Sequence, residues 1–305
     1  MNAIVSTPIS IPQLHERAML AYISVSAPAF RKLDKKSTVE VTRDNNATAD
    51  AVRVNKHLLA SADTLLKDIA KKGGEARRYL DANSLPWDDA GNRLLSNEKA
   101  IDVVKALGVM EREYKEMVDK FVVEYPVLRA QALSNLGDLA DPGEYPPPSE
   151  VREKFSMRLS LTPMPQGFGD LRTGLVGAQV SALQAQYEAR VRMQFHTAIK
   201  DAWERLRMNV AAIAERMDAR LNQTDLDSGK RKTFRDSLFE NARETCELLK
   251  SLNVFDDPQL EAIRYEVEQR LCQDAEQVRE SDTLTREVKD QAEAILARMA
   301  AILGE

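Results

Sequence analysis

The residues best suited to chemistry are few in this sequence. It contains two cysteines, Cys246 and Cys272, and three histidines among 305 residues. Thiolates and imidazoles are common nucleophiles and zinc ligands, but no histidine lies near either cysteine to activate it. We therefore expect both cysteines to be small buried hydrophobes, and we expect neither a disulfide framework nor a metal site.

Two short segments partly match ligand-binding motifs. Gly167-Phe168-Gly169 begins like a dinucleotide fingerprint, but Arg172 stands where the third glycine is needed. The segment from Asp225 begins like a calcium loop, yet its glycine comes one position early and its twelfth residue is Asp236 rather than glutamate. We interpret that segment as a turn with capping carboxylates. We expect no cofactor, and because no pattern predicts catalysis we expect a protein that is not an enzyme.

Basic residues form two clusters that are candidates for nucleic-acid contact. Positive side chains beside an aromatic such as Tyr79 can bind phosphates and stack on a base of a single strand. Basic residues also complement the carbonyl end of a helix, and the formal net charge of −5 favours this structural interpretation. The candidate residues are Lys71, Lys72, Arg77 and Arg78 in the first cluster, and Lys230, Arg231 and Lys232 in the second.

A long helix is the clearest element that the sequence predicts. Apolar residues recur at spacings of three and four between residues 177 and 221, which indicates one continuous helix of roughly 60 Å at about 1.5 Å per residue. Part of this stripe alternates between four and three, as in a coiled coil, so it needs a partner helix from the same chain or from another copy. We expect this self-association seam to consist of Ile199, Trp203, Leu206, Val210, Ile213 and Met217.

Other helices are expected on both sides of the long one. A helix at 234–252 should end before Asp257, which can cap the next helix, with Pro258 in its first position. That helix either continues or restarts at Ser281. Nearer the N-terminus we expect a helix at 47–72 that stops at Gly73-Gly74, and a helix at 97–136 that Pro126 kinks or ends.

A small antiparallel sheet is expected among these helices. Apolar and polar residues alternate strictly over 155–162, which is typical of a half-buried strand, and 20–26 and 37–42 can supply two more strands. The proline-rich segment 141–148 is interpreted as a stiff polyproline linker into the strand.

The expected fold is therefore mainly α: an elongated antiparallel helical bundle or coiled coil with a minor β-sheet insertion. We expect a helical domain with the sheet at 1–170 and a long-helix bundle at 171–305. The chain is 43% hydrophobic and 30% charged, which suits a soluble protein. Because it shows neither a long apolar run nor a signal-peptide pattern, we expect a cytoplasmic protein without a membrane partner.

Several segments, taken in order, resemble a known family. The most specific is Leu85-Pro86-Trp87-Asp88-Asp89-Ala90-Gly91-Asn92-Arg93-Leu94-Leu95, preceded by Arg77-Arg78-Tyr79-Leu80 and followed by Phe121 to Pro126, Tyr145 to Phe155 and Thr162 to Pro165. Between Leu20 and Pro165 the chain is similar to an uncharacterised family of tailed-phage and prophage proteins. Its members are often encoded beside a MoxR-type AAA ATPase and a cobalt-chelatase-like protein with a von Willebrand factor A domain. The resemblance implies a viral protein of a bacteriophage in the host cytoplasm, and no catalytic residues.

The loop between Pro86 and Gly91 has two interpretations. Trp87 can anchor the loop on a pair of helices by burying its ring. Alternatively, Trp87 and Arg93 form a docking surface for a partner protein. Burial of an aromatic ring explains Trp87 by itself, so we favour anchoring.

Three functional hypotheses follow. The first is a non-enzymatic homo-oligomer of phage origin that acts as a scaffold or adaptor, with an AAA ATPase as a possible partner. The second is a protein that binds or anneals single-stranded nucleic acid, and the third is an inhibitor of a host defence or replication protein. We favour the first hypothesis because of the predicted seam and the family resemblance.

Overall fold

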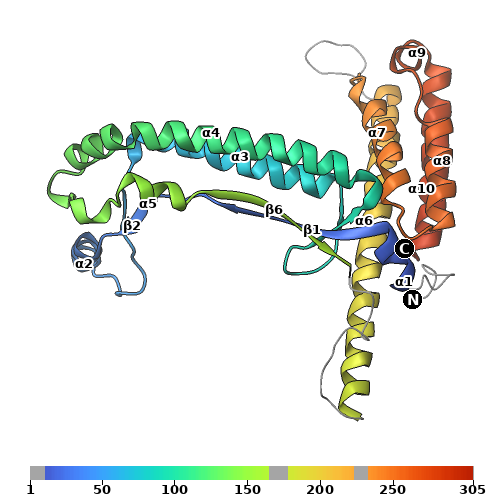
Figure 1. Ribbon diagram of the computed structural model, residues 1–305. Helices are drawn as coiled ribbons and strands as arrows, with labels where there is room; N and C mark the ends of the chain where they lie inside the picture. Colours follow the sequence, from blue (N-terminus) through green and yellow to red (C-terminus); the bar gives the residue numbers. More distant parts are fainter. Residues whose placement is uncertain (1–10, 165–177, 223–232, 305) are drawn as a thin grey trace. The chain divides into compact units, whose positions relative to one another are not determined.

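The computed structural model of the protein describes residues 11–164, 178–222 and 233–304 (Figure 1). This part of the chain is mainly helical, with ten α-helices and a small antiparallel sheet, as the sequence predicts. The described residues form two compact units. The first comprises residues 11–22, 81–101, 161–164, 178–222 and 233–304, and the second comprises residues 23–80 and 102–160. The sequence suggested one division after residue 170. Elements such as α4 (Asn97–Leu136) contain residues of both units, so no local signal marks these boundaries.

The sheet has the strand order β4-β5-β1-β6, and β2 and β3 form a separate antiparallel pair. Ala18 lies opposite Ser96 and Ala21 opposite Arg93 where β1 and β5 pair. The strands predicted at 20–26 and 155–162 are confirmed as β1 and β6. The strands are β1 (Ala18–Ser26), β2 (Arg31–Leu33), β3 (Asn55–His57), β4 (Leu85–Pro86), β5 (Arg93–Ser96) and β6 (Ser156–Pro163).

The strand predicted at 37–42 is wrong, because this segment belongs to helix α2 (Lys35–Asp44). Asp34 caps the helix: its carboxylate accepts a hydrogen bond of 2.8 Å from the amide of Ser37. The alternating residues Val39 and Val41 suggested a strand, but both are exposed on the helix. The alternating residues therefore do not mark the buried face of a strand. The cap at Asp34 was the better signal, because it predicts a helix here.

Helix α3 (Asp63–Ala82) also differs from its prediction at both ends. Residues 47–62 contain β3 and a turn of 3₁₀-helix at Ala60–Ala62 instead of the first half of a helix. The helix then continues through Gly73 and Gly74. A Cβ atom on Gly73 would lie only 2.5 Å from Cγ1 of Val25, so this glycine allows close approach of a strand and does not end the helix.

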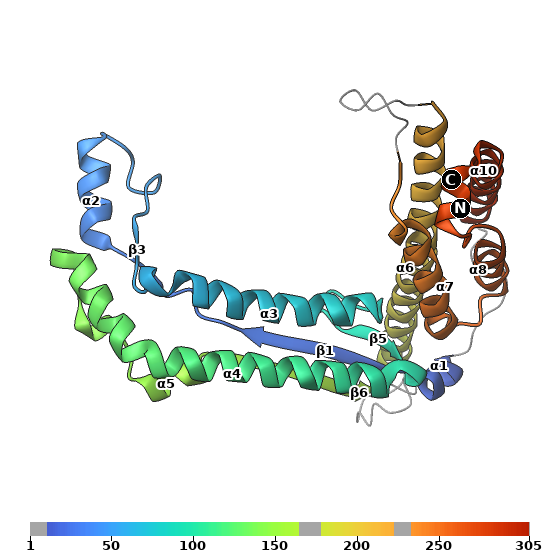
Figure 2. The same ribbon diagram turned by 90° about the horizontal axis from the view of Figure 1, so that it is seen from above.

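In the second unit α3 and α4 lie side by side, and β1 runs along them (Figures 1 and 2). The hydroxyl of Tyr114 on α4 donates a hydrogen bond of 2.6 Å to the carbonyl of Ser26 on β1. An aromatic cluster closes the core, with ring centroids 5.8 Å apart for Phe30 and Phe121 and 5.5 Å apart for Phe121 and Phe155. The contacts between helices and strands therefore hold this unit together.

Helix α4 has the predicted bounds and continues past Pro126 to Leu136. The proline-rich segment that follows is not a polyproline linker. It contains a turn of 3₁₀-helix at Pro142–Glu144 and the short helix α5 (Pro148–Glu153), which begins with a proline as helices often do.

The first unit contains the remaining helices, which pack around one hydrophobic core. The predicted long helix is confirmed as α6. Asp257 caps α8, as the sequence predicted. Ser281 caps a separate helix, α10, so a new helix begins there. The helices are α1 (Ile11–Arg17), α6 (Ala178–Asn222), α7 (Ser237–Leu252), α8 (Pro258–Arg270), α9 (Ala275–Glu280) and α10 (Asp282–Leu303).

Candidate functional site

The predicted self-association seam lies in the interior of the first unit. Its residues are buried against α7, α8 and α10, which pack on α6. The spacing of a coiled coil shows that a helix needs a partner but not which chain supplies it, and here the same chain does. The predicted self-association seam is therefore a face of the core within one chain. Its residues are Ile199, Trp203, Leu206, Val210, Ile213 and Met217.

The loop around Trp87 is anchored within the first unit. The indole of Trp87 is only 6% exposed, and its ring centroid lies 5.9 Å from that of Phe195 in an edge-on arrangement. Phe195 in turn lies 5.0 Å from Phe255. These contacts hold the β4-β5 hairpin on α6 and favour the anchoring interpretation over a docking surface.

Arg93 also helps to hold the β4-β5 hairpin in place. Its guanidinium donates hydrogen bonds to the carbonyl oxygens of Asp81 and Ser84, at 3.1 and 2.9 Å. Arg205 of α6 donates to the same two carbonyls and to that of Ala82, at 2.8–2.9 Å. Burial lowers the pKa of Arg93, and the charge of nearby Arg205 acts in the same direction while Asp81 opposes it.

The two arginines therefore bind carbonyls at and just after the C-terminal end of α3, where positive charge is favourable. The sequence did not reveal Arg205, because it is separated from these carbonyls by more than a hundred residues and lies on a helix rich in other charges.

The first basic cluster is partly engaged within the second unit. The ammonium of Lys72 lies 2.8 Å from Glu113 and 3.2 Å from Glu75, and hydrogen bonds to these carboxylates raise the pKa of Lys72. Arg77 donates a hydrogen bond of 2.9 Å to the carbonyl of Val25. Lys71 and Arg78 are exposed, seven residues apart on α3. The second cluster, Lys230, Arg231 and Lys232, lies outside the described residues, as does most of the segment that resembles a calcium loop.

A buried ionic cluster in the second unit was not predicted. The ammonium of Lys56 lies 2.7 Å from Glu144 and 3.7 Å from Asp34, and it donates a hydrogen bond of 3.0 Å to the carbonyl of Leu139. The contact with Glu144 raises the pKa of Lys56, while the amide of Ser37 is the main cause of the lowered pKa of Asp34. The ion pairs of the cluster therefore join three segments of the chain, around Asp34, Lys56 and Glu144.

Helix α4 has an exposed apolar stripe in addition to its buried face. Val123 is 79% exposed and Val127 is 62% exposed, and Pro126 and Ala130 are exposed beside them. Val123 lies three and four residues before Pro126 and Val127, and Ala130 lies four and three residues after them, so the four residues share one face of the helix. We call Val123, Pro126, Val127 and Ala130 the α4 stripe.

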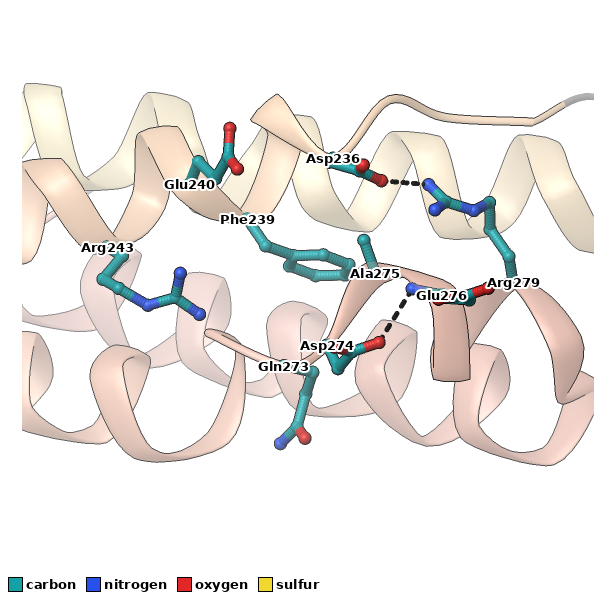
Figure 3. Close-up of a pocket in the computed structure, with 9 residues that line it drawn as sticks. All are labelled: Asp236, Phe239, Glu240, Arg243, Gln273, Asp274, Ala275, Glu276 and Arg279. Carbon is teal, nitrogen blue, oxygen red and sulfur yellow. Dashed lines mark hydrogen bonds and ion pairs between the residues drawn. The ribbon is translucent and has the colours of Figure 1, made fainter.

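A hollow of about 240 Å³ opens between α7 on one side and α9 with the segment that precedes it on the other (Figure 3). Arg243 and Gln273 lie at one end, and Asp236 and Arg279 lie at the other, joined by an ion pair of 2.6 Å. The remaining lining residues are Phe239, Glu240, Asp274, Ala275 and Glu276. The lining mixes both signs of charge and does not favour a strongly charged ligand.

Within the described ranges, His, Cys, Asp and Glu nowhere form a group of three or more that could hold a metal ion. Over the same ranges, each helix is too short or too polar to span a lipid bilayer. In comparisons with known proteins, no family model matches the chain, and no curated protein or solved structure matches it either.

Proposed function

We propose that the protein is a non-enzymatic helical scaffold that assembles through the α4 stripe. The family resemblance supports a phage origin, and it suggests an AAA ATPase as a further partner of the assembly. Self-association through the face between Ile199 and Met217 is withdrawn from this proposal, because that face is buried in the first unit.

The observation that carries the proposal is the presence of two apolar faces on one helix. Phe121, Tyr125 and Leu128 point into the core of the second unit, whereas Val123 and Val127 on the other side are mostly exposed. A helix that is apolar on more than one face normally buries each of them. An uncovered stripe with the spacing of a helix-packing surface is therefore typical of an interface with another helix.

The occupant that we propose is a second copy of the chain. A two-fold contact needs only one self-complementary surface, and the α4 stripes of two copies provide it. Apolar residues with small side chains, such as Val127 and Ala130, allow two helices to approach closely. Binding to a different host protein through the same stripe is the alternative that the test below separates.

Nucleic-acid binding remains the second candidate, because Lys71 and Arg78 are exposed on one face of α3. Its test is binding of a labelled single-stranded oligonucleotide at about 50 mM salt, where phosphate contacts are strong. Binding that weakens with salt and is lost in the Lys71→Glu, Arg78→Glu variant would support this candidate.

The experiment for the scaffold is light scattering behind size exclusion with the full chain. We expect a defined oligomer for the natural sequence and a monomer for the Val123→Glu, Val127→Glu variant, because two carboxylates cannot be buried in an apolar contact. Met208 is 63% exposed on α6, so Met208→Glu is a matched control that should leave the oligomer intact. A natural chain that is monomeric would overturn the proposed self-association and direct attention to another partner protein.

A further inference from the structure

The two cysteines of the chain lie together in the first unit. Cys246 is buried on α7, and Cys272, which follows α8, is partly exposed. Each thiol shifts the pKa of the other, so the two side chains are neighbours although they are separated by 26 positions in the sequence. The thiol of Cys246 also lies 3.7 Å from the carbonyl of Arg264 on α8, to which it can donate.

Arg243 holds the segment that contains Cys272 against α7. It is one turn before Cys246 on this helix, and its guanidinium donates a hydrogen bond of 3.2 Å to the carbonyl of Cys272. Arg243 and Gln273, the residue after Cys272, both line the hollow shown in Figure 3. The hollow therefore borders Gln273, the residue next to the more exposed cysteine.

We propose that Cys272 and Cys246 form a peroxide-sensitive thiol pair, in which Cys272 is oxidised first and Cys246 then closes a disulfide. In the first step the Cys272 thiolate attacks hydrogen peroxide. A sulfur–oxygen bond forms, the oxygen–oxygen bond breaks, and the departing hydroxide takes a proton to become water. Cys272 is thereby oxidised to a sulfenic acid while the peroxide is reduced.

In the second step the sulfur of Cys246 attacks the sulfenic sulfur of Cys272. A sulfur–sulfur bond forms, the sulfur–oxygen bond breaks, and the hydroxide leaves with the proton of the Cys246 thiol as a second water molecule. In total the two thiols lose two electrons and two protons, and one hydrogen peroxide becomes two waters. The product joins α7 to the segment between α8 and α9.

The surroundings of the two sulfurs give them different roles. The neighbouring thiol of Cys246 lowers the pKa of Cys272, and the positive charge of Arg243 acts in the same direction against the effect of burial. The neighbouring Cys272 and its own burial raise the pKa of Cys246. The thiolate is therefore concentrated on Cys272, the less buried of the two cysteines, as an attacking cysteine requires.

The first test treats the reduced full chain with hydrogen peroxide and maps its peptides by mass spectrometry. We expect the native protein to lose two hydrogen atoms and to yield one linked pair of peptides containing Cys246 and Cys272. Because the chain has two cysteines in all, an intramolecular disulfide has one possible pairing. A disulfide that forms only after unfolding in urea, or only between chains, would overturn the proposal.

Single variants separate the two roles. With peroxide, Cys246→Ala should accumulate a sulfenic acid at Cys272 that dimedone traps, whereas Cys272→Ala should keep Cys246 as a free thiol. Trapping at Cys246 with none at Cys272 would contradict the assigned order of the two steps.

Arg243 is a positioning residue in this scheme, and its test is a pH profile. Arg243→Gln should slow alkylation of Cys272 by iodoacetamide near pH 7 several-fold and shift the profile to higher pH, because the charge that stabilises the thiolate is removed. Arg243→Lys should restore most of the rate. An unchanged pH profile in Arg243→Gln would contradict a role for Arg243 in the reactivity of Cys272.

Discussion

The indole Nε1 of Trp203 donates a hydrogen bond of 3.0 Å to Oδ2 of Asp257. The other carboxylate oxygen of Asp257 accepts hydrogen bonds from the amides of Gln259 and Leu260, at 2.9 and 3.2 Å, and so caps α8. One carboxylate thus fixes the start of α8 and satisfies a buried group at the centre of α6. The seam of α6 therefore belongs to the core of the first unit through a polar contact as well as through apolar packing.

Replacing Asp257 should destabilise the first unit. Asp257→Ala removes a helix cap and leaves the indole N–H of Trp203 without its partner, which together cost roughly 2–4 kcal/mol. Asp257→Asn retains one acceptor oxygen, which cannot serve both the indole of Trp203 and the amides at the start of α8. We therefore expect this variant to lose about half as much unfolding free energy. Urea unfolding measures both values, and equal stability of Asp257→Ala and the natural chain would show that the bond contributes nothing.

The two glycines in α3 should respond to alanine in opposite ways. A Cβ atom on Gly73 would lie 2.5 Å from Val25, whereas on Gly74 its nearest neighbour is the flexible end of Arg78 at 3.5 Å. Gly73→Ala should therefore destabilise the second unit by roughly 1–3 kcal/mol through overpacking. Gly74→Ala should stabilise it by up to about 1 kcal/mol, because alanine favours a helix. Thermal unfolding compares them, and a stable Gly73→Ala would contradict the close packing of β1 on α3.

The guanidinium of Arg205 should be needed for its shape as well as its charge. Arg205→Lys keeps the charge but cannot reach all three carbonyls at the end of α3, so we expect a loss of roughly 1–3 kcal/mol in unfolding free energy. The matched control is Arg192→Lys on the same helix, since Arg192 is exposed and lies 3.7 Å from Glu188. Equal effects of the two substitutions in urea unfolding would argue against the anchorage by Arg205.

Burial of Tyr114 should make the free energy of unfolding depend on pH in the alkaline range. Burial raises the pKa of Tyr114 from its ordinary value near 10 to about 12, with Arg77 opposing this shift. The folded protein therefore keeps the phenolic proton at a pH where the unfolded chain has lost it. The corresponding stabilisation is complete below pH 10 and is lost as the pH rises from about 10 to 12, by up to about 3 kcal/mol.

Tyr114→Phe tests this response, because phenylalanine cannot titrate. The variant also loses the hydrogen bond to Ser26, so it should be less stable at neutral pH, but its stability should fall less steeply between pH 10 and 12. Unfolding curves at several pH values give the slopes. Parallel slopes for the two proteins would mean that other groups cause the alkaline loss.

Local signals in the sequence predicted much of the secondary structure. The uninterrupted apolar stripe predicted α6, the pair Asp257-Pro258 predicted the start of α8, and strict alternation predicted β6. Each of these features depends on neighbours within a few residues. The prediction of a strand at 37–42 was wrong because alternating residues in a short exposed segment resemble a strand. The segment is helical, and Asp34 caps the start of this helix.

Features that depend on distant parts of the chain could not be predicted in the same way. The spacing of residues around Trp203 is the same whether the partner helix belongs to the same chain or to another copy. Arg205, the cluster around Lys56 and the contact between Cys246 and Cys272 all join segments far apart in sequence. Their roles follow from the tertiary structure, because no local pattern distinguishes these residues from others of the same type.

Photo-crosslinking at position 127 is the most direct test of assembly through α4. A benzophenone amino acid in place of Val127 should yield a crosslinked dimer under ultraviolet light, with the crosslinked peptide in α4 of the second copy, because the proposed contact joins the α4 stripes of two copies. The same amino acid in place of Met208 should yield none. No dimer at position 127, or equal yields at positions 127 and 208, would contradict assembly through the α4 stripe.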